Sequence, residues 1–349
     1  MSKGKALIFG VTGQDGSYLA ELLLEEGYTV HGVRRRVSTF NTGRIETLIQ
    51  NPLLWEKRFH LHYGDVTDMS SLSSIISVVK PDLIFNLAAQ SHVGLSFDLP
   101  VNSVDIAGLG CVRILESLRQ MQKLSEIKFY QSSTSELFGG QDKLPLTESS
   151  QFNPRSPYAL GKLLAYWNTR FFREAYGLHA SNGILFNHES PRRGETFVTR
   201  KITRGLARIV LGKADSLMLG NLYAQRDWGH AKDFVKSMYL MTNWDFGDDY
   251  VVATGIQHSV KDFVNYALDY LNISVSWEGE GIEERAIESS TGKVMIKVDP
   301  GYYRPLEVDN LLGNSDKIRK RLGWAPSYSF SQIVEEMIEY DLEDQSRRN

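Results

Sequence analysis

Short apolar runs alternate with amphipathic stretches along the first half of the chain. "SYLAELLLEEG" is typical of the stretches, since its leucines recur at helical spacing until Gly27. The apolar runs have the length of buried strands and are "KALIFG", "YTVHGV", "FHLHYGD", "DLIFNLA" and "IKFYQSS". Strands that alternate with helices pair in parallel through right-handed crossovers. The pattern therefore predicts an α/β fold with a Rossmann-type, doubly wound parallel sheet, whose ligands lie beyond the carboxyl ends of the strands.

The second half of the chain continues this pattern and then departs from it. "LGKLLAYWNTRFFREAYG" predicts a long helix, "ASNGILFN" a sixth strand, and "DYVVATG" a strand that returns to the sheet. Residues 277–299 fit either a hairpin or a mobile loop, and the tail predicts two helices joined around Pro326. We expect a Rossmann domain and a smaller, mixed α/β substrate-binding lobe. Their predicted extents are residues 1–186 with about 228–257, and about 187–227 with 258–349.

Composition changes this picture little, but it excludes several classes of function. A chain of 349 residues exceeds the size at which one core usually stops growing, which agrees with two lobes. The net charge of -3 provides no field that attracts nucleic acid or an anionic membrane, and no apolar run approaches the roughly 20 residues that span a bilayer. The first residues lack the apolar core of a signal peptide, so we expect a cytoplasmic protein. The single cysteine, Cys111, is interpreted as a buried structural thiol, and no metal site is predicted.

The segment "GVTGQDG" lies between the first predicted strand and the first predicted helix. Gly10 permits a tight turn, Gly13 lets the backbone approach a pyrophosphate, and Gly16 lets helix and strand pack closely. The amide groups at the start of the helix face the anion. The residues predicted to contact a dinucleotide here are Gly10, Thr12, Gly13, Gln14, Asp15 and Gly16.

Three arginines stand where an acidic residue would bind the ribose of NAD. Arg34, Arg35 and Arg36 follow the second strand, roughly 20 residues beyond the glycines. Guanidinium groups match a 2′-phosphate in charge and geometry, so the predicted cofactor is NADP. The alternative is a solvated basic turn, and one of the arginines could instead serve a subunit contact. After the third and fourth strands, the predicted contacts are Asp65 and Val66 for the adenine and Leu87, Ala88, Ala89, Gln90 and Ser91 on the nicotinamide side.

The segments "QSSTSELFG" and "RSPYALGK" carry the candidate chemistry. Tyr158 and Lys162 lie one helical turn apart and hence on one face of a helix. A free tyrosine has a pKa of about 10 and is a poor base at neutral pH, but a nearby cation favours the phenolate. Tyr158 can then accept a hydroxyl proton while a hydride leaves the same carbon. Glu136 adds a carboxylate that an ordinary oxidoreductase does not need; the alternative is a strand-end carboxylate that caps a turn.

Longer blocks extend these motifs over nearly the whole chain: "FNTGRIE", "STSELFG", "PRSPYALGK", "NHESPRRGETFVTRKI", "RDWGHAKDFV" and "YYRPLEVD". Together they resemble the GDP-mannose 4,6-dehydratase family of extended short-chain dehydrogenases/reductases. The resemblance implies conversion of GDP-D-mannose to GDP-4-dehydro-6-deoxy-D-mannose and water, the first step of GDP-fucose or GDP-rhamnose type synthesis. The sugar is oxidised at C4, water is eliminated across C5 and C6, and the hydride returns to C6. No net redox occurs, so NADP is expected to be tightly held and recycled in each turnover.

The same resemblance assigns catalytic roles to four residues. Thr134 would bind the C4 oxygen, and Glu136 would remove the C5 proton and pass it to the departing C6 hydroxyl. Tyr158 would serve as the acid and base of the redox steps, and Lys162 would also hold the nicotinamide ribose.

Further binding residues follow from the resemblance. His188 and Arg193 would approach the nicotinamide end of the cofactor. Asn102 stands where the family has a tyrosine near the cofactor, and the lost hydroxyl removes a hydrogen bond worth about 0.5–1.5 kcal/mol if asparagine cannot replace it. The residues expected on the substrate are Ser91, Ser135, Asn187, Arg192, Lys201, Arg226, Arg304 and Glu307.

The resemblance also implies a homodimer or homotetramer, with residues 34–44 as a candidate contact. Two other functions stay open: a nucleotide-sugar 4-reductase or epimerase of the same superfamily, and a dehydratase with a side reductase activity. Glu136 argues against the first of these. A silent NADP-binding module is disfavoured because all four reacting positions are intact. The guanine base rests on the resemblance alone.

Overall fold

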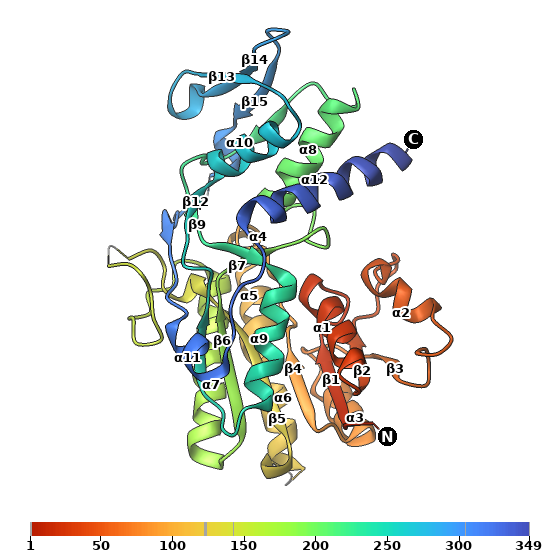
Figure 1. The fold of residues 1–349 in the computed structure, drawn as a ribbon. Helices are drawn as coiled ribbons and strands as arrows, with labels where there is room; N and C mark the ends of the chain where they lie inside the picture. The colour runs from red at the N-terminus through yellow and green to blue at the C-terminus, as the bar shows by residue number, and fades with distance from the viewer. Residues whose placement is uncertain (1, 122–123, 142, 304, 349) are drawn as a thin grey trace.

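A seven-stranded parallel sheet forms the centre of the molecule (Figure 1). The computed structural model describes residues 2–121, 124–141, 143–303 and 305–348. The strand order is β11-β6-β5-β4-β1-β2-β3, so the sheet is doubly wound, as the sequence predicted. The strands are β1 (Lys5–Phe9), β2 (Thr29–Arg34), β3 (Phe59–Tyr63), β4 (Leu83–Asn86), β5 (Lys128–Thr134), β6 (His179–Leu185) and β11 (Asp249–Val252).

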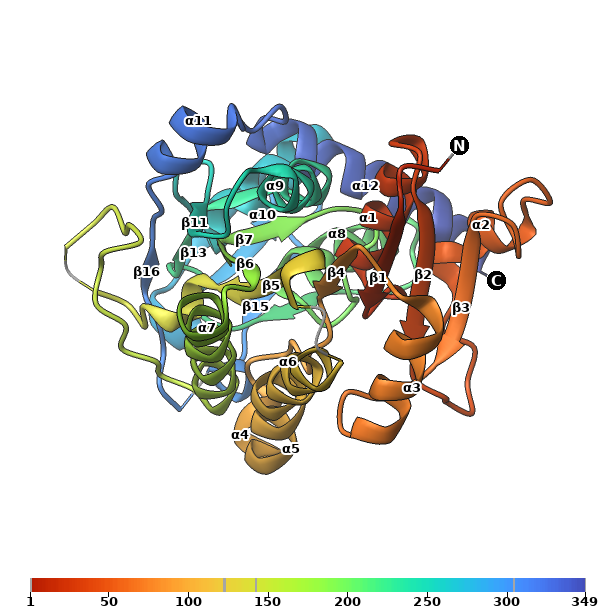
Figure 2. The same ribbon diagram turned by 90° about the horizontal axis from the view of Figure 1, so that it is seen from below.

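Helices cover both faces of this sheet (Figure 2). Side chains alternate across a strand, so in β1 Ala6 and Ile8 join one buried cluster while Leu7 and Phe9 join the other. The first cluster includes side chains of α1 (Gln14–Glu25) and α9 (Ala231–Asn243). The opposite face is covered by α3 (Met69–Val79), α6 (Gly110–Gln120) and α7 (Pro157–Tyr176). The predicted fold class is therefore confirmed.

Helix α7 has clear start and stop signals. The Ser156 hydroxyl accepts a hydrogen bond from the amide of Ala159, and Pro157 occupies the first turn. Gly177 ends the helix in the left-handed conformation with a φ of 67°, which glycine adopts without a steric cost. The start of the helix is thereby held beside the end of β5, where the candidate catalytic residues lie.

Shorter helices connect the larger elements. A π-helical turn at residues 105–109 joins α5 to α6. The short helices are α2 (Glu46–Gln50), α4 (Leu95–Asp98) and α5 (Pro100–Val104).

A second group of elements lies above the carboxyl ends of the strands in Figure 1. Its core is a separate apolar cluster to which three helices contribute, α8 (Val198–Val210), α10 (Val260–Tyr270) and α12 (Phe330–Arg347). They pack with a mixed sheet of β8 (Leu217–Leu219), β13 (Val275–Glu278), β14 (Arg285–Glu288) and β15 (Val294–Val298). Small pairings complete the group: β7 (Asn187–Glu189) with β10 (Trp228–His230), and β9 (Gln225–Arg226) with β12 (His258–Ser259) and β16 (Asn310–Leu311).

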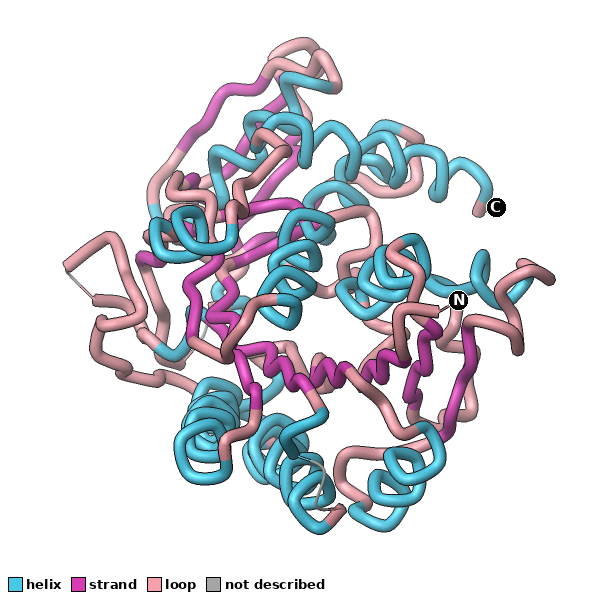
Figure 3. The backbone as a smooth tube through the Cα atoms, turned by 60° about the horizontal axis from the view of Figure 1, so that its bottom comes forward, coloured by secondary structure: helices cyan, strands magenta, loops and turns pink. Residues whose placement is uncertain are grey.

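Several local predictions can be compared with these elements in Figure 3. The predicted returning strand is β11, which pairs with β6 in parallel. Residues 277–299 contain an antiparallel hairpin of β14 and β15 rather than a loop. The tail forms two helices, α11 (Asp316–Leu322) and α12, and Pro326 lies between them. Ile318 and Trp324, however, pack in the cluster that contains α1 and α9, although the sequence placed them in the other lobe.

Two further expectations concern burial and membranes. Cys111 is fully buried against α7, as predicted, and burial raises the pKa of its thiol to about 12. Among the helices that the structure describes, none combines the length and the apolar character needed to cross a bilayer.

Candidate active site

A large cavity opens where the strands of the parallel sheet end. Its volume is about 1030 Å³, and it is lined by residues that follow β1, β4, β5 and β6, together with residues of the upper group of elements. The carboxyl edge of a doubly wound sheet is where such folds bind their ligands. The cavity therefore lies where the sequence predicted a cofactor and a substrate to meet.

The glycine segment forms one wall of this cavity. Gly10 has a φ of 87°, and a Cβ atom there would lie 3.0 Å from the backbone carbon of Leu87. A Cβ atom at Gly16 would lie 2.3 Å from the carbonyl oxygen of Gly10, so only glycine allows α1 to start so close to β1. The start of α1 also lines the cavity, where its free amide groups suit an anion. These features fit a dinucleotide pyrophosphate.

The residues predicted for the adenosine end are only partly brought together. Arg34 and Arg35 line the cavity, and Arg34 donates a 2.7 Å hydrogen bond to the Tyr63 hydroxyl. Arg36 does not line it. Val66 lines the cavity, whereas the Asp65 carboxylate accepts hydrogen bonds from the Thr67 amide and hydroxyl instead. The other residues predicted to bind the cofactor, on the nicotinamide side and at Asn102, also line the cavity: Leu87, Ala88, Ala89, Gln90, Ser91 and Asn102.

The four candidate catalytic residues meet at the end of β5 and the start of α7. Thr134, Glu136, Tyr158 and Lys162 are all buried and all line the cavity. The Thr134 hydroxyl accepts a 3.2 Å hydrogen bond from the Glu136 amide, which fixes the turn that carries the carboxylate. Lys162 Nζ donates to the Ser132 carbonyl at 2.8 Å and lies 5.9 Å from the centre of the Tyr158 ring. The parallel pairing of β5 between β4 and β6 sets the position of this whole group.

Burial is the largest influence on the pKa of both Tyr158 and Lys162. It raises the pKa of Tyr158 to about 12, although hydrogen bonding with Thr134 acts in the opposite direction. Burial lowers the pKa of Lys162 to about 8. The sequence argument relied on the lysine charge to favour the phenolate; in the folded chain, desolvation is the stronger effect on both groups.

Residues at the start of β7 form the opposite wall. Asn187, His188 and Arg193 line the cavity. His188 contacts Asp15 through Nε2 at 2.9 Å. Arg193 pairs with the buried Glu189 at 3.0 Å.

The predicted substrate residues are divided between the cavity and other places. Ser91, Ser135, Lys201, Arg226 and Glu307 line it. Arg226 is buried, and its guanidinium lies 3.8 Å from the Glu307 carboxylate. The Lys201 ammonium lies 3.1 Å from the centre of the Tyr302 ring.

One of the predicted substrate residues that the structure describes does not line the cavity. Arg192 points to α1, where its guanidinium donates hydrogen bonds to Ser17 at 3.0 Å and Glu21 at 2.8 Å. Its placement therefore does not support a role in binding a diphosphate. Arg304 lies outside the described residues.

Comparison with known proteins decides the family. A family model described as GDP-mannose 4,6 dehydratase matches residues 7–337. The chain belongs to this family. The GDP-mannose 4,6-dehydratase of Sinorhizobium fredii is 54% identical over 337 residues, which cover 97% of this chain and 96% of that protein. The GDP-mannose 4,6 dehydratase of Homo sapiens is 52% identical, over 97% of this chain and 91% of that protein.

Solved structures of more distant proteins share the fold of this GDP-mannose 4,6-dehydratase family member. A dTDP-glucose 4,6-dehydratase from Streptomyces venezuelae with NAD bound superposes with a TM-score of 0.81 over 98% of both chains, at 21% identity. RMD from Pseudomonas aeruginosa complexed with NADPH gives a TM-score of 0.75 over 98% of both chains, at 19% identity. At these identities the likeness shows the fold alone.

The cavity of this family member also contains residues that the sequence analysis did not single out. Arg44 lines it and donates to the carbonyl oxygens of Arg192 and Thr12, at 2.6 and 3.4 Å; burial lowers the pKa of this guanidinium. Glu189 and Tyr302 also line it. All three lie within or beside the blocks "FNTGRIE", "NHESPRRGETF" and "YYRPLEVD", which were the available signal.

Proposed function

We propose that this chain is a hydro-lyase that converts GDP-D-mannose to GDP-4-dehydro-6-deoxy-D-mannose and water, in the cytoplasm. Two lines of support converge. Relatives with 54% and 52% identity over nearly the full length carry the name GDP-mannose 4,6-dehydratase. The observation that carries the proposal is the position of Glu136 in the same cavity as Thr134, Tyr158 and Lys162.

Tyr158 and its neighbours would transfer the proton of the C4 hydroxyl group. The Tyr158 oxygen would accept the proton of the sugar C4 hydroxyl, while the Thr134 hydroxyl orients the C4 oxygen. Because C4 remains a ketone in the product, that proton would pass to C5 when the hydride arrives at C6. Lys162 is held by the Ser132 carbonyl, so its charge stays on the tyrosine side of the cavity. A bound nicotinamide cofactor would supply the hydride acceptor at C4 and the hydride donor at C6.

Glu136 provides the elimination. A ketone at C4 makes the C5 proton acidic, and the Glu136 carboxylate would remove it and deliver a proton to the departing C6 hydroxyl. The turn that carries Glu136 is fixed by the Thr134 hydroxyl, so the carboxylate stays next to the residue that binds C4. Burial on the cavity wall keeps bulk water away from the reacting carbons.

The cofactor is proposed to be NADP. Arg34 and Arg35 line the adenosine side of the cavity, and no carboxylate follows β2 at the ribose position. Arg35→Ala should weaken binding of NADP much more than binding of NAD, since only NADP has the 2′-phosphate. Arg36→Ala is the control, because Arg36 does not line the cavity. Isothermal titration calorimetry with both cofactors measures this; equal losses would rule out Arg35 as the 2′-phosphate ligand.

We also propose a homo-oligomer. Phe40 is 77% exposed on the loop after β2, and Trp167 and Phe171 are about half exposed on α7, so apolar side chains lie open on two surfaces. Light scattering of the Phe40→Asp and Trp167→Asp variants should show which surface forms a dimer and whether the other completes a tetramer. A wild-type protein that is monomeric at micromolar concentration would contradict the proposal.

The activity is tested with purified protein and GDP-mannose, without added reductant. A product lighter by one water is expected, and Glu136→Gln should abolish it while leaving NADP binding unchanged. An unchanged mass after long incubation with NADP would reject the dehydratase. Excess NADPH decides the remaining alternative, since reduction of the keto product to a rhamnose-type sugar would reveal a side reductase activity.

A further inference from the structure

His188 is held by hydrogen bonds on both of its ring nitrogens. Nδ1 lies 2.8 Å from the Phe186 carbonyl oxygen, and Nε2 lies 2.9 Å from Asp15 Oδ2. A carbonyl oxygen only accepts, so Nδ1 must carry a hydrogen atom. The short contact between Nε2 and a carboxyl oxygen also requires a hydrogen atom between them. The pair therefore holds two protons in total, either as imidazolium and carboxylate or as neutral imidazole and carboxylic acid.

The surroundings favour the imidazolium and the carboxylate. Gln14 donates a 3.1 Å hydrogen bond to the other Asp15 oxygen, which stabilises the carboxylate. Burial on its own lowers the pKa of His188, but the charge and hydrogen bond of Asp15 outweigh it and raise that pKa above its ordinary value. Burial on its own raises the pKa of Asp15, but His188 and Gln14 outweigh it and lower that pKa. The His188 ring also stacks on Phe234, with 4.5 Å between the ring centres.

The same contacts join two walls of the cavity. Asp15 and Gln14 belong to the first turn of α1, and His188 belongs to β7. Gln14 donates to the His188 carbonyl at 3.1 Å and accepts from the Ser190 hydroxyl at 2.8 Å. Three side-chain contacts thus hold the start of α1, with its free amide groups, against β7.

A carboxylate at this place needs compensation. Asp15 lies at the start of α1, where the glycine segment fits a pyrophosphate, and a second negative charge beside that anion is unfavourable. An imidazolium 2.9 Å away cancels most of the field of Asp15 at the anion. Other titratable or charged side chains that interact with this pair are Arg193, Tyr130, Tyr158 and Lys162.

We propose that Asp15 and His188 are positioning residues that share the proton between Nε2 and Oδ2. This proton holds α1 against β7 and compensates the negative charge of Asp15 beside the cofactor phosphates. The proposal deepens the proposed function, on which it rests for the identity of the cofactor. Loss of the Nε2 proton of His188 at high pH would leave the negative charge of Asp15 uncompensated and break the contact between the two side chains. Cofactor affinity should therefore fall as the pH rises through the pKa of His188.

A double-mutant cycle on NADP affinity tests the charge compensation. His188→Gln should weaken NADP binding about 10- to 100-fold at pH 7, because Asp15 is left without its counter-charge. Asp15→Asn should cost less than about threefold and should flatten the pH dependence, because no charge needs compensation. Adding Asp15→Asn to His188→Gln should recover most of the affinity. Losses that simply add in the double variant would overturn the proposal.

A second measurement needs neither NADP nor GDP-mannose. Nuclear magnetic resonance of the histidine ring nitrogens in the wild-type protein should show both nitrogens of His188 protonated at pH 7, and Asp15→Asn should lower the pH at which this state is lost. His179→Gln serves for assignment and as a control outside the cavity. A neutral His188 ring at pH 7 overturns the proposal. These readouts are independent of dehydration, so failure of the dehydratase assay would leave them interpretable.

Discussion

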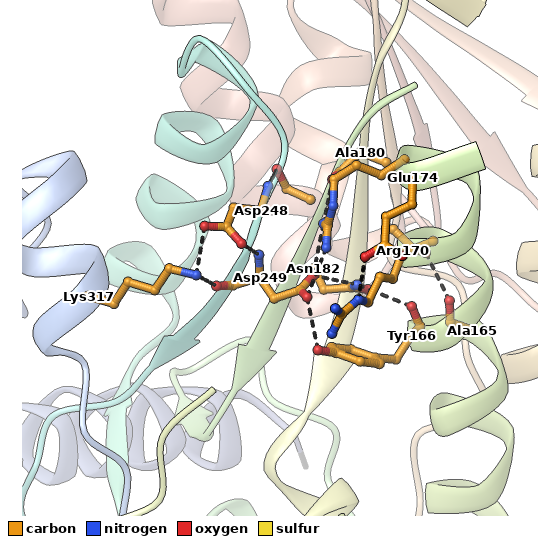
Figure 4. Close-up of polar contacts among 12 residues, drawn as sticks. Ala165, Tyr166, Arg170, Glu174, Ala180, Asn182, Asp248, Asp249 and Lys317 are labelled. Carbon is orange, nitrogen blue, oxygen red and sulfur yellow. Dashed lines mark hydrogen bonds and ion pairs between the residues drawn. The ribbon is translucent and has the colours of Figure 1, made fainter. Parts of the chain in front are cut away.

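Helix α7 contributes to two buried clusters that contain the same three kinds of side chain. At its start, Tyr158 and Lys162 lie near Glu136 and line the cavity. Further along the same helix, Tyr166 meets Asp249, which is also buried (Figure 4). Arg173 of this helix donates to the same carboxylate. Each cluster therefore contains a tyrosine, a cation and a carboxylate.

In the second cluster, protein atoms satisfy both carboxylate oxygens of Asp249. Asp249 accepts a 2.9 Å hydrogen bond from Tyr166, two of 3.0 Å from Arg173 and one of 2.9 Å from Asn182 (Figure 4). Burial on its own raises the pKa of Asp249, but these partners outweigh it and lower that pKa. The cluster joins α7, β6 and β11, and Lys317 extends it to α11 through the Asp249 carbonyl.

The two clusters differ in the cation and in the space beside them. Arginine does not release its proton in proteins, whereas burial lowers the pKa of Lys162 to about 8. Tyr158, Lys162 and Glu136 border a cavity, so their polar atoms can act on a ligand; the groups around Asp249 act only on one another. The same residue types can therefore act on a ligand in the first cluster, which has a titratable lysine and borders the cavity. In the second cluster, which has an arginine instead and does not line the cavity, they hold secondary-structure elements together.

The largest expected effect is on kcat and comes from replacing the tyrosine of each cluster with phenylalanine, in separate variants. Tyr158→Phe should lower kcat about 10²–10⁴-fold, because no other group can move the C4 proton, and should leave unfolding nearly unchanged. Tyr166→Phe should lower the free energy of unfolding by about 1.5–3 kcal/mol and leave kcat within about twofold, because it removes a bond to a charged group. Steady-state kinetics and urea denaturation measure both. Similar kcat values for the two variants would erase the distinction between the clusters.

Removing the cation of the second cluster should be the next largest effect. Arg173→Met leaves Asp249 charged and buried and should lower the free energy of unfolding by about 3–5 kcal/mol. Arg170→Met is the matched control, since Arg170 forms an exposed pair with Glu174 one turn along the same helix, worth about 0.3–0.5 kcal/mol. Equal losses in denaturation experiments would show that Asp249 does not depend on Arg173.

Removing the cation of the first cluster, Lys162, should change the free energy of unfolding in the opposite direction. The folded pKa of Lys162, about 8, lies below its ordinary value of 10.5, so the unfolded chain holds more protons between these pH values. The cost of burying the charge is therefore fully present below pH 8 and disappears as the pH rises toward 10.5. Lys162→Met should raise the free energy of unfolding by about 1–3 kcal/mol at pH 7 while abolishing activity. A destabilised variant would contradict this, and it would mean that the Ser132 hydrogen bond outweighs desolvation.

The smallest expected effect concerns a cluster of histidines on β2 and β3. His31 lies 3.0 Å from His62 between ring nitrogens and stacks on His60 with 4.7 Å between ring centres. Burial first, and then its two neighbours, lower the pKa of His31 to about 4. Because this pKa lies below the ordinary 6.5, the unfolded chain gains protons first on acidification, and stability is lost as the pH falls from 6.5 toward 4.

For this partly buried ring the loss should be about 1–2 kcal/mol after allowance for solvent screening. His31→Gln should flatten that part of the stability profile, measured by denaturation between pH 4 and 7. His179→Gln should leave it unchanged. A slope that His31→Gln does not alter would exclude the histidine cluster as its origin.

Neighbouring arginines show where prediction from the sequence ended. Arg192 and Arg193 adjoin in one block, yet Arg193 lines the cavity while Arg192 pairs with Glu21 on α1. The identity of a loop residue and of its sequence neighbours does not specify the direction in which its side chain points. The strands, the glycine segment and α7 could be predicted because short-range patterns determine them.

The Asp249 cluster was missed for a related reason. Asp249 lies far from its partners at 166, 173 and 182 in the sequence. Only the pairing of β11 with β6 brings Asp249 to α7. Long-range pairing depends on packing free energy that is distributed over many contacts, and no single segment reveals it.

The sequence by itself determined the parallel sheet, the family, and the residue types of the reacting group, because periodicity, glycine spacing and the Tyr-x-x-x-Lys turn are local properties. Tertiary structure decided which arginines reach the cavity, that burial is the largest influence on the pKa of Tyr158, and that Asp15 meets His188. Those outcomes depend on burial and on distances between segments that only the folded chain brings together.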